Sequence, residues 1–125
     1  YALSLLARRS VAHRRIINDK ADYIAGKGIA CREDMPLLKQ LTLCANGSGE
    51  SLRSVIARLA LDEAMFGNAF LEVVTDAQHS FLSFFHVDAS TCRLSRDSRH
   101  VILHHNWANF RPAEARSLPA LFFSS

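Results

Sequence analysis

The fold of this chain is decided by residues 61–74, which read LDEAMFGNAFLEVV. The first part of this stretch continues an apolar pattern of helical period, and the last part is rich in aromatic and β-branched residues, as strands are. Gly67 accepts the left-handed backbone that ends a helix, and Asn68 tolerates unusual backbone angles next to it. We therefore predict a helix that stops at Gly67-Asn68 and runs directly into a strand, with Phe70 packed between them.

On the N-terminal side of this junction we predict three helices, over about residues 3–25, 37–43 and 51–66. The first should end at Gly26, which supplies a left-handed stop, and Pro36 suits the first position of the second. Ser48 or Ser51 can cap the third helix, after a loop at residues 45–49. The apolar stripe of the first helix is expected to consist of Leu3, Leu6, Val11, Ile16, Ile17 and Ile24.

On the C-terminal side the pattern changes to that of strands, which we predict over about residues 69–75, 81–87, 91–94 and 100–105. Polar turns join these strands, so we expect an antiparallel β-meander. The pattern breaks down after Trp107, and residues 107–125 are expected to form an irregular tail whose apolar end, 118–123, has no evident partner in the chain. Residues 1–125 are thus predicted to be one α+β domain fragment, with N-terminal helices followed by the meander.

Composition indicates an ordinary globular chain, with 49% hydrophobic and 22% charged residues. No apolar run approaches the ~20 residues that cross a bilayer. Cys31, Cys44 and Cys92 are odd in number and lack paired spacing, so we expect buried free thiols in a reducing compartment rather than a disulfide framework. The chain begins with Tyr1 and ends on an apolar segment, and we expect both ends to be cut points of a longer protein.

The net charge of +3 is unevenly distributed, because Arg8, Arg9, Arg14 and Arg15 all precede the first acid, Asp19. Such a basic opening suits phosphate or an acidic partner, and it equally suits a solvated helix face. Nucleic-acid readers usually interleave aromatic residues with basic ones, and here the aromatics lie elsewhere. We therefore treat the four arginines as a possible interface.

The histidines are the first candidates for chemistry. On a continuous strand His100 and His104 would face one side and His105 the other, with His86 on a neighbouring strand. Their spacing matches no zinc motif, so we expect no metal site. No nucleophile motif or phosphate-binding loop is present either, and we expect no catalytic residue and no cofactor.

Acidic residues at two places could form an acid/base pair or an ion pair. Asp62 and Glu63 are adjacent, so they point to different helix faces and do not form an acid/base pair. Glu72 is the one charged residue of its predicted strand, and it either faces solvent or pairs across the sheet with an arginine such as Arg93. The residues expected to matter are therefore structural, namely Gly26, Gly67, Asn68, Phe70 and Trp107.

Three stretches, taken in order, resemble tailed-phage portal proteins. In that family a helix ends in Gly-Asn and passes into an aromatic-containing strand, as at residues 61–74 here. Residues 85–93, FHVDASTCR, resemble the family's second strand and its turn into the third. The Asn46-Gly47 loop lies before the helix in the expected order, whereas the glycine usual beside the acidic turn residue, here Asp76, is absent.

The resemblance extends from about residue 6 to residue 107 and implies the wing region of a phage or prophage portal subunit. Such subunits form a homo-oligomeric ring at one capsid vertex, through which DNA passes during packaging and ejection. Terminase, head–tail connector and capsid proteins dock on the ring. The resemblance thus implies a structural protein of the virion, found in the host cytoplasm during assembly, with no membrane contact and no enzymatic activity. It places no DNA-contacting residue on this chain.

Two other classes stay open. The first is a bacterial α+β binding or regulatory module that self-associates through its apolar C-terminal arm. The second is a fragment of a metal-dependent hydrolase that uses His86, His104 and His105.

Overall fold

The computed structural model describes residues 2–30, 35–78 and 82–121 and has the predicted α+β fold. Its helices are α1 (Ala2–Arg9), α2 (Val11–Ala25), α3 (Pro36–Leu43) and α4 (Leu52–Phe66). Its strands are β1 (Phe70–Thr75), β2 (Leu82–Val87), β3 (Cys92–Leu94), β4 (His100–Leu103) and β5 (Arg116–Pro119). Three short 3-10 helices are η1 (Ala89–Thr91), η2 (Trp107–Asn109) and η3 (Pro112–Glu114).

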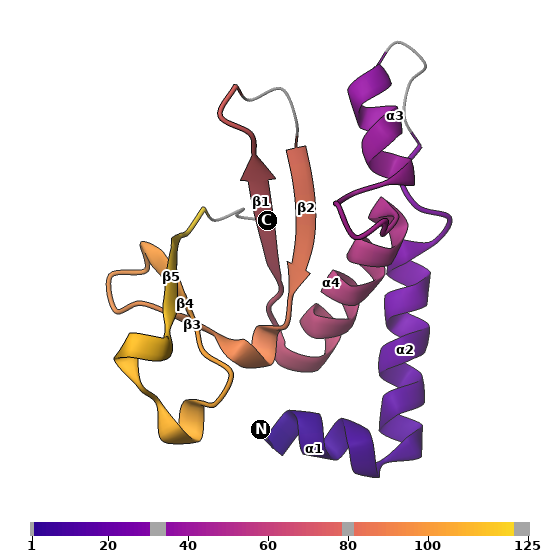
Figure 1. Cartoon of the computed structure of the whole chain (residues 1–125). Helices are drawn as coiled ribbons and strands as arrows, with labels where there is room; N and C mark the ends of the chain where they lie inside the picture. The colour runs from indigo at the N-terminus through magenta and orange to yellow at the C-terminus, as the bar shows by residue number, and fades with distance from the viewer. Residues whose placement is uncertain (1, 31–34, 79–81, 122–125) are drawn as a thin grey trace.

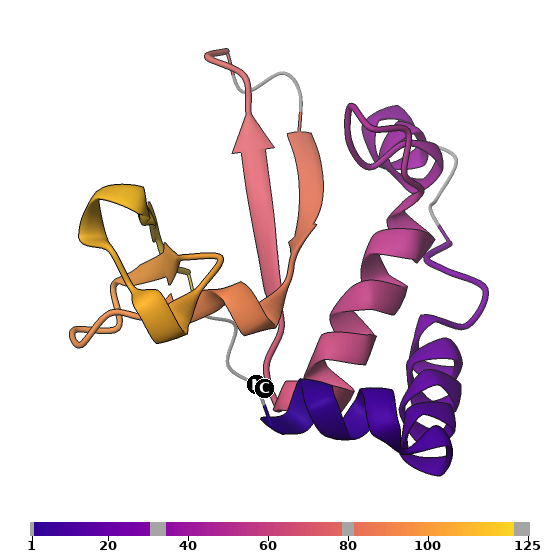
Figure 2. The same ribbon diagram turned by 60° about the horizontal axis from the view of Figure 1, so that its bottom comes forward.

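The β1–β2 hairpin stands between the helices on one side and the three C-terminal strands on the other (Figure 1). Helix α4 packs against both α2 and β2, so it is the central element of the helical side. Figure 2 shows α1 lying across the lower end of α4 and meeting the start of α2. No helix in the described parts of the chain is long and apolar enough to cross a membrane.

The predicted junction between helix and strand is present. Gly67 takes a left-handed φ of 73°, and its N–H donates to the Glu63 carbonyl at 2.9 Å, which closes α4. Asn68 does not share this geometry, because Ser98 is the one described non-glycine residue with positive φ. Gly67 alone therefore accommodates the change of direction, and the strand that follows pairs with β2 from Phe70 opposite Val87.

The prediction of one helix over residues 3–25 is wrong, because the helix divides at Ser10. Ser10 has extended backbone angles, and its Oγ accepts from the His13 N–H at 3.2 Å, which makes it the N-cap of α2. The Arg14 guanidinium donates to the carbonyls of Ala7 and Arg8, at 3.0 and 2.7 Å, and so satisfies free carbonyls at the end of α1. A serine that caps a new helix and an arginine that caps the old one explain the break.

The predicted apolar stripe of this helix is also wrong for every member except Ile17. The buried face of α2 consists of Ile17, Ala21 and Ala25, spaced four residues apart, and it faces α4. Small side chains allow the two helices to approach closely. The other members of the predicted stripe, Leu3, Leu6, Val11, Ile16 and Ile24, are exposed. The break at Ser10 starts a new helix, so one continuous stripe cannot describe both.

The strands are antiparallel, as predicted, but they form two sheets rather than one meander. One sheet is β1–β2, and the other has the order β3–β4–β5. The cause is η1, where the Asp88 side chain accepts from the Ser90 N–H at 2.8 Å and turns the chain away from β2. Strand β3 therefore pairs with β4, with Cys92 opposite Leu103, and not with the hairpin.

Part of the predicted irregular tail is regular. Residues 116–119 form β5, in which Leu118 lies opposite Val101 of β4, so this apolar residue has a partner after all. Strand β4 ends at Leu103, two residues before the predicted end at 105. Residues 122–125 lie outside the described part of the chain.

The conformation of Gly67 yields a stability prediction. Gly67→Ala should destabilise the fold by about 1–2 kcal/mol, because a Cβ disfavours the left-handed region. Space is not the cause, since an added Cβ would meet no atom within 4 Å. Gly47 is a matched control, because it also has room for a Cβ but does not have positive φ. Chemical denaturation should therefore show Gly47→Ala to be neutral or slightly stabilising; equal effects of the two substitutions would contradict this account.

Candidate functional site

The loop before α4 is a buried polar anchor rather than a surface connection. Asn46 is fully buried, and its Nδ2 donates to the Glu50 carboxylate at 2.8 Å and to the Phe84 carbonyl at 3.0 Å. Its Oδ1 accepts from the backbone N–H of Ser48 at 3.0 Å. The Ala45 carbonyl accepts from the Phe84 N–H at 2.7 Å. Both main-chain groups of Phe84 are thus bound by this loop, which covers the outer edge of β2.

Glu50 belongs to the same anchor. Its carboxylate accepts a hydrogen bond from Asn46 and forms an ion pair with the guanidinium of Arg58 on α4. The hydrogen bond from Asn46, helped by the positive charge of Arg58, holds the pKa of Glu50 below its usual value. A lowered carboxyl pKa means that Glu50 favours the folded state at neutral pH, and that this contribution is lost as pH falls through the folded-state pKa.

A second buried anchor lies near the other end of β2. The carboxylate of Asp62 on α4 accepts from His86 Nε2 at 2.8 Å and from the backbone N–H of Ala89 at 2.9 Å. Both side chains are nearly inaccessible, at 8% for Asp62 and 12% for His86. This carboxylate therefore holds α4, β2 and η1 together.

Sequence reasoning missed this role for Asp62, although a signal for it exists. Asp62 follows Val55 by seven positions, so it belongs on the same helix face as this fully buried valine. A carboxylate on a buried face requires hydrogen-bond donors, and His86 is one of the few donors in the strands that follow. The expectation that Asp62 and Glu63 point to different sides is consistent with the structure, where Asp62 is buried and Glu63 is exposed.

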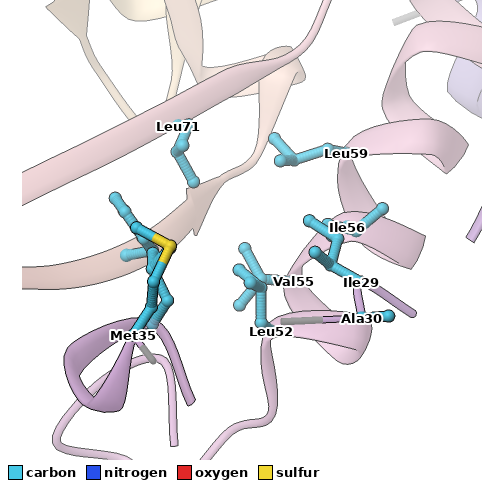
Figure 3. A pocket seen from close by; sticks show the side chains of 10 residues that line it. Ile29, Ala30, Met35, Leu52, Val55, Ile56, Leu59 and Leu71 are labelled. Carbon is cyan, nitrogen blue, oxygen red and sulfur yellow. The ribbon is translucent and has the colours of Figure 1, made fainter. Parts of the chain in front are cut away.

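An apolar cavity of about 500 Å³ lies between α4, the start of α3 and the hairpin (Figure 3). The side chains of Leu52, Val55, Ile56 and Leu59 form the α4 wall, and Leu71 lies opposite them. Every described lining residue is apolar, so nothing in this wall would orient a polar ligand or transfer a proton. The described wall of the cavity is therefore suited to apolar contact.

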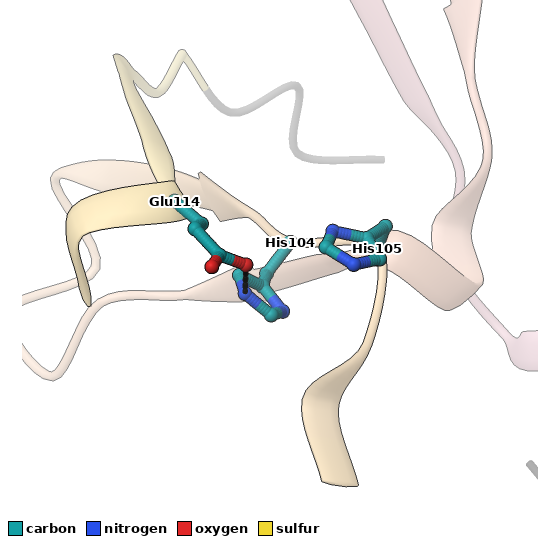
Figure 4. Close-up of side chains that lie close together, drawn as sticks. All are labelled: His104, His105 and Glu114. Atoms are coloured by element: carbon teal, nitrogen blue, oxygen red, sulfur yellow. Dashed lines mark ion pairs between the residues drawn. The ribbon is translucent and has the colours of Figure 1, made fainter. Parts of the chain in front are cut away.

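The described residues contain one group that brings together three metal-ligand side chains, His104, His105 and Glu114 (Figure 4). The two imidazole rings are stacked, with centroids 4.8 Å apart, so the prediction that they face opposite sides of a strand is wrong. The reason is that β4 ends at Leu103, and side chains beyond it no longer alternate. His86 lies outside this group, bound to Asp62 instead.

Hydrogen bonds to His104 argue against metal ligation. Its Nδ1 accepts from the Asn106 N–H at 3.1 Å, while the Arg111 N–H approaches Nε2 at 3.4 Å. A neutral imidazole has one acceptor nitrogen, so the ring accepts only one of these two hydrogen bonds at a time, and each nitrogen is turned toward a backbone donor. Nε2 also lies 3.8 Å from the Glu114 carboxylate. A zinc ion would have to displace a backbone donor from His104, and the ligand atoms, spread over as much as 4.8 Å, would have to close to roughly 3.3 Å.

The same histidine lies in an aromatic cluster that holds the last sheet together. Trp107 stacks on Phe110 with centroids 5.1 Å apart, and His104 meets both rings edge-on. The Trp107 indole N–H donates to the Thr91 carbonyl at 2.9 Å, and the Arg93 guanidinium lies 5.1 Å above its ring. The structure thus places Trp107 in a structural position, at the centre of this cluster.

The other predicted residues are dispersed. Gly26 ends α2 with a φ of 49°, and its carbonyl accepts from Arg53 Nε at 2.8 Å. Glu72 pairs with Arg116 at 2.6 Å, and not with Arg93 as proposed from the sequence. Residue 116 belongs to a strand that the sequence did not reveal, which is why this pair was missed.

One of the four basic residues of the possible interface is engaged within the fold. Arg14 is engaged with α1 carbonyls, and Arg15 forms an exposed pair with Asp19 at 3.8 Å. Arg8 and Arg9 remain in the last turn of α1, where positive charge suits the helix dipole. Arg8, Arg9 and Arg15 therefore remain exposed, and their role as an interface stays a prediction.

The cysteines only partly fit the expected buried thiols. Cys92 is buried, and burial raises the pKa of its thiol, which keeps it unreactive. Cys44 is exposed, and its Sγ donates to the Asn46 carbonyl at 3.1 Å. Cys31 lies outside the described residues.

Comparisons of this chain with protein-family models, with curated proteins and with solved structures find no significant match.

The buried carboxylate leads to a prediction with a neighbouring control. Asp62→Ala should lower the free energy of unfolding by about 2–4 kcal/mol, because it leaves the Ala89 N–H and the His86 ring without their buried acceptor. Glu63→Ala, one position along the helix but exposed, should change it by less than about 0.5 kcal/mol. Urea denaturation of both variants measures the difference, and similar values would refute the role assigned to Asp62.

The spacing of the group around His104 leads to another prediction. Adding Zn²⁺ at a few equivalents should leave the melting temperature of the chain unchanged, because both ring nitrogens of His104 face backbone donors and the ligand atoms lie up to 4.8 Å apart. A bound metal at 100 times its Kd would instead stabilise the fold by about 2.7 kcal/mol. His105→Ala is the control. A rise in melting temperature that this substitution abolishes would show that the group does bind metal.

Proposed function

We propose that this chain is part of a ring-forming structural subunit, the portal protein of a tailed phage or prophage. In this role it contributes to the outer region of a homo-oligomeric ring at the capsid vertex, through which DNA is packaged and ejected. Its role is structural, and the terminase, connector and capsid proteins would bind to the ring. The proposal starts from the resemblance of residues 61–74 and 85–93 to that family.

The observation that carries the proposal is that the resembling stretches form one hydrogen-bonded unit. Asn46, from the loop before α4, binds the Phe84 carbonyl beside the second stretch. Asp62, from the first stretch, binds His86 and Ala89 from the second. Stretches that resemble a family only by their order in the sequence would not need to contact one another in the fold. The hydrogen bonds between these stretches therefore support one structural unit of the kind that the resemblance implies.

The surface offers further support for an assembling subunit. Large apolar side chains are exposed along α1, α2 and β1, among them Val11, Ile16, Tyr23 and Val73. Extended apolar surface on a folded protein marks sites where another protein binds. A subunit that contacts neighbours on both sides in a ring has use for such surface.

The same exposed surface also suits a self-associating binding or regulatory module. The two functions differ in symmetry, because a module that pairs through one face closes as a dimer. A ring requires two different faces on each subunit. Particle shape therefore separates them.

Electron microscopy of the complete gene product that contains this chain tests the proposal. Rings of defined rotational symmetry around a central channel are the expected result, at low and at high ionic strength. Their fixed subunit number distinguishes them from non-specific aggregates. Monomers or dimers alone, with no ring in assembled particles or packaging complexes, would overturn the proposal.

A further inference from the structure

The closed outer edge of β2 determines which main-chain groups of β1 face outward. The Phe84 N–H donates to the Ala45 carbonyl at 2.7 Å, and the Phe84 carbonyl accepts from Asn46 Nδ2 at 3.0 Å. Both main-chain groups of Phe84 therefore point away from β1. In an antiparallel pair the residue directly opposite behaves in the same way, so Val73 points its own N–H and C=O away from β2.

Three residues of β1 share this outward direction, because the direction repeats every second residue: Leu71, Val73 and Thr75. Among the described strands β1 pairs with β2 alone, so this row of donors and acceptors lies at an open edge. Its side chains are exposed as well, at 39% for Leu71 and 51% for Val73. The occupant that satisfies such a row is another extended backbone with apolar side chains.

The other sheet edges are protected in the described parts of the chain. Strand β5 contains Pro119, which has no N–H to donate. In β3 the Cys92 N–H donates to the Ala89 carbonyl, and the Cys92 carbonyl accepts from the Arg93 guanidinium at 2.6 Å. Strand β1 has no proline and no lysine, and its one charged residue, Glu72, is already in an ion pair. It therefore lacks the usual devices that keep a strand edge from pairing.

A second copy of the chain presents the same open edge, and one antiparallel register suits both copies. In that register Val73 lies opposite the partner's Val73, and Glu72 lies opposite the partner's Val74. A shift of two residues in one direction places Glu72 opposite the partner's Glu72. A shift in the other direction places it opposite the partner's Asp76. Like charges directly opposite each other are destabilising, so both shifted registers are disfavoured.

We propose that two copies of this chain pair through β1, with Val73 opposite the partner's Val73, and form a four-stranded sheet of order β2–β1–β1–β2. A two-stranded hairpin is only marginally stable, and the pairing doubles its strand number. It also places Leu71, which lines the apolar cavity, opposite the partner's Thr75 (Figure 3). The inference goes beyond the proposed function, because a contact about a two-fold axis joins two chains and does not by itself close a ring.

The pairing can be tested on the 125-residue chain under reducing conditions. Sedimentation equilibrium should show a monomer that converts to a dimer as the protein concentration rises. Amide hydrogen exchange followed by NMR locates the contact. The N–H groups of Leu71, Val73 and Thr75 should exchange at least about tenfold more slowly in the dimer than in dilute protein. Those of Glu72 and Val74, which face β2, should be protected in both states.

Three variants make the test specific. Val73→Lys should raise the dissociation constant of the dimer at least about tenfold, because two lysines would then meet at the two-fold axis. Val11→Lys is the matched control, since Val11 is 80% exposed on α2, and it should leave the constant unchanged. Val74→Lys should instead lower the constant by about two- to fivefold at low salt, because the new charge faces the partner's Glu72.

Several results would overturn the proposal. A chain that stays monomeric at millimolar concentration does not make this contact. Slow exchange of residues 71, 73 and 75 in the complete gene product, but not in this chain, would assign the edge to a different segment. Equal weakening by Val73→Lys and Val11→Lys would mean that exposed apolar surface associates without specificity. Weakening by Val74→Lys would exclude the proposed register.

Discussion

The attachment of β2 to α4 by two buried polar side chains is the constraint on which the rest of this structure depends. Asn46, just before the helix, binds the strand at Phe84, and Asp62, near the end of the helix, binds it at His86. Buried polar groups are costly unless they are hydrogen-bonded, so each anchor tolerates few alternative arrangements. Because β1 pairs with β2, these two anchors position the whole hairpin.

The anchors matter more here because the apolar core is modest. Most of its buried residues are alanines, with Ile17, Leu41 and Val55 as the larger members. Burial of apolar area is what stabilises most folds, and alanine contributes little of it. Much of the larger apolar surface instead faces outward on α1, α2 and β1. The molecule thus combines a small interior, held by buried polar groups, with large apolar side chains on its surface.

Because the core is small, histidines and arginines, which in other proteins often take part in chemistry, have structural roles in this chain. His86 holds Asp62, and His104 supports the turn after β4 through its Nδ1. Arg14 caps α1, and Arg116 reaches across to Glu72. None of these roles requires a reacting substrate. An architectural function is therefore consistent with how these side chains are used.

What the sequence by itself determined was local. The left-handed stop at Gly67, the cap at Ser51, the start of α3 at Pro36 and the strand character of residues 70–75 follow from backbone preferences and side-chain periodicity, which act over a few residues. The α+β class followed from their order. The break at Ser10 was also encoded locally, but a continuous apolar pattern concealed the capping serine.

Only the tertiary structure decided which distant groups meet. The pairing of Asp62 with His86, of Glu72 with Arg116 and of β5 with β4 joins residues 24, 44 and about 16 positions apart. No local preference selects such partners. They are chosen because a buried carboxylate must find donors and a strand edge must find a neighbour, and those requirements are met only when the whole chain has folded.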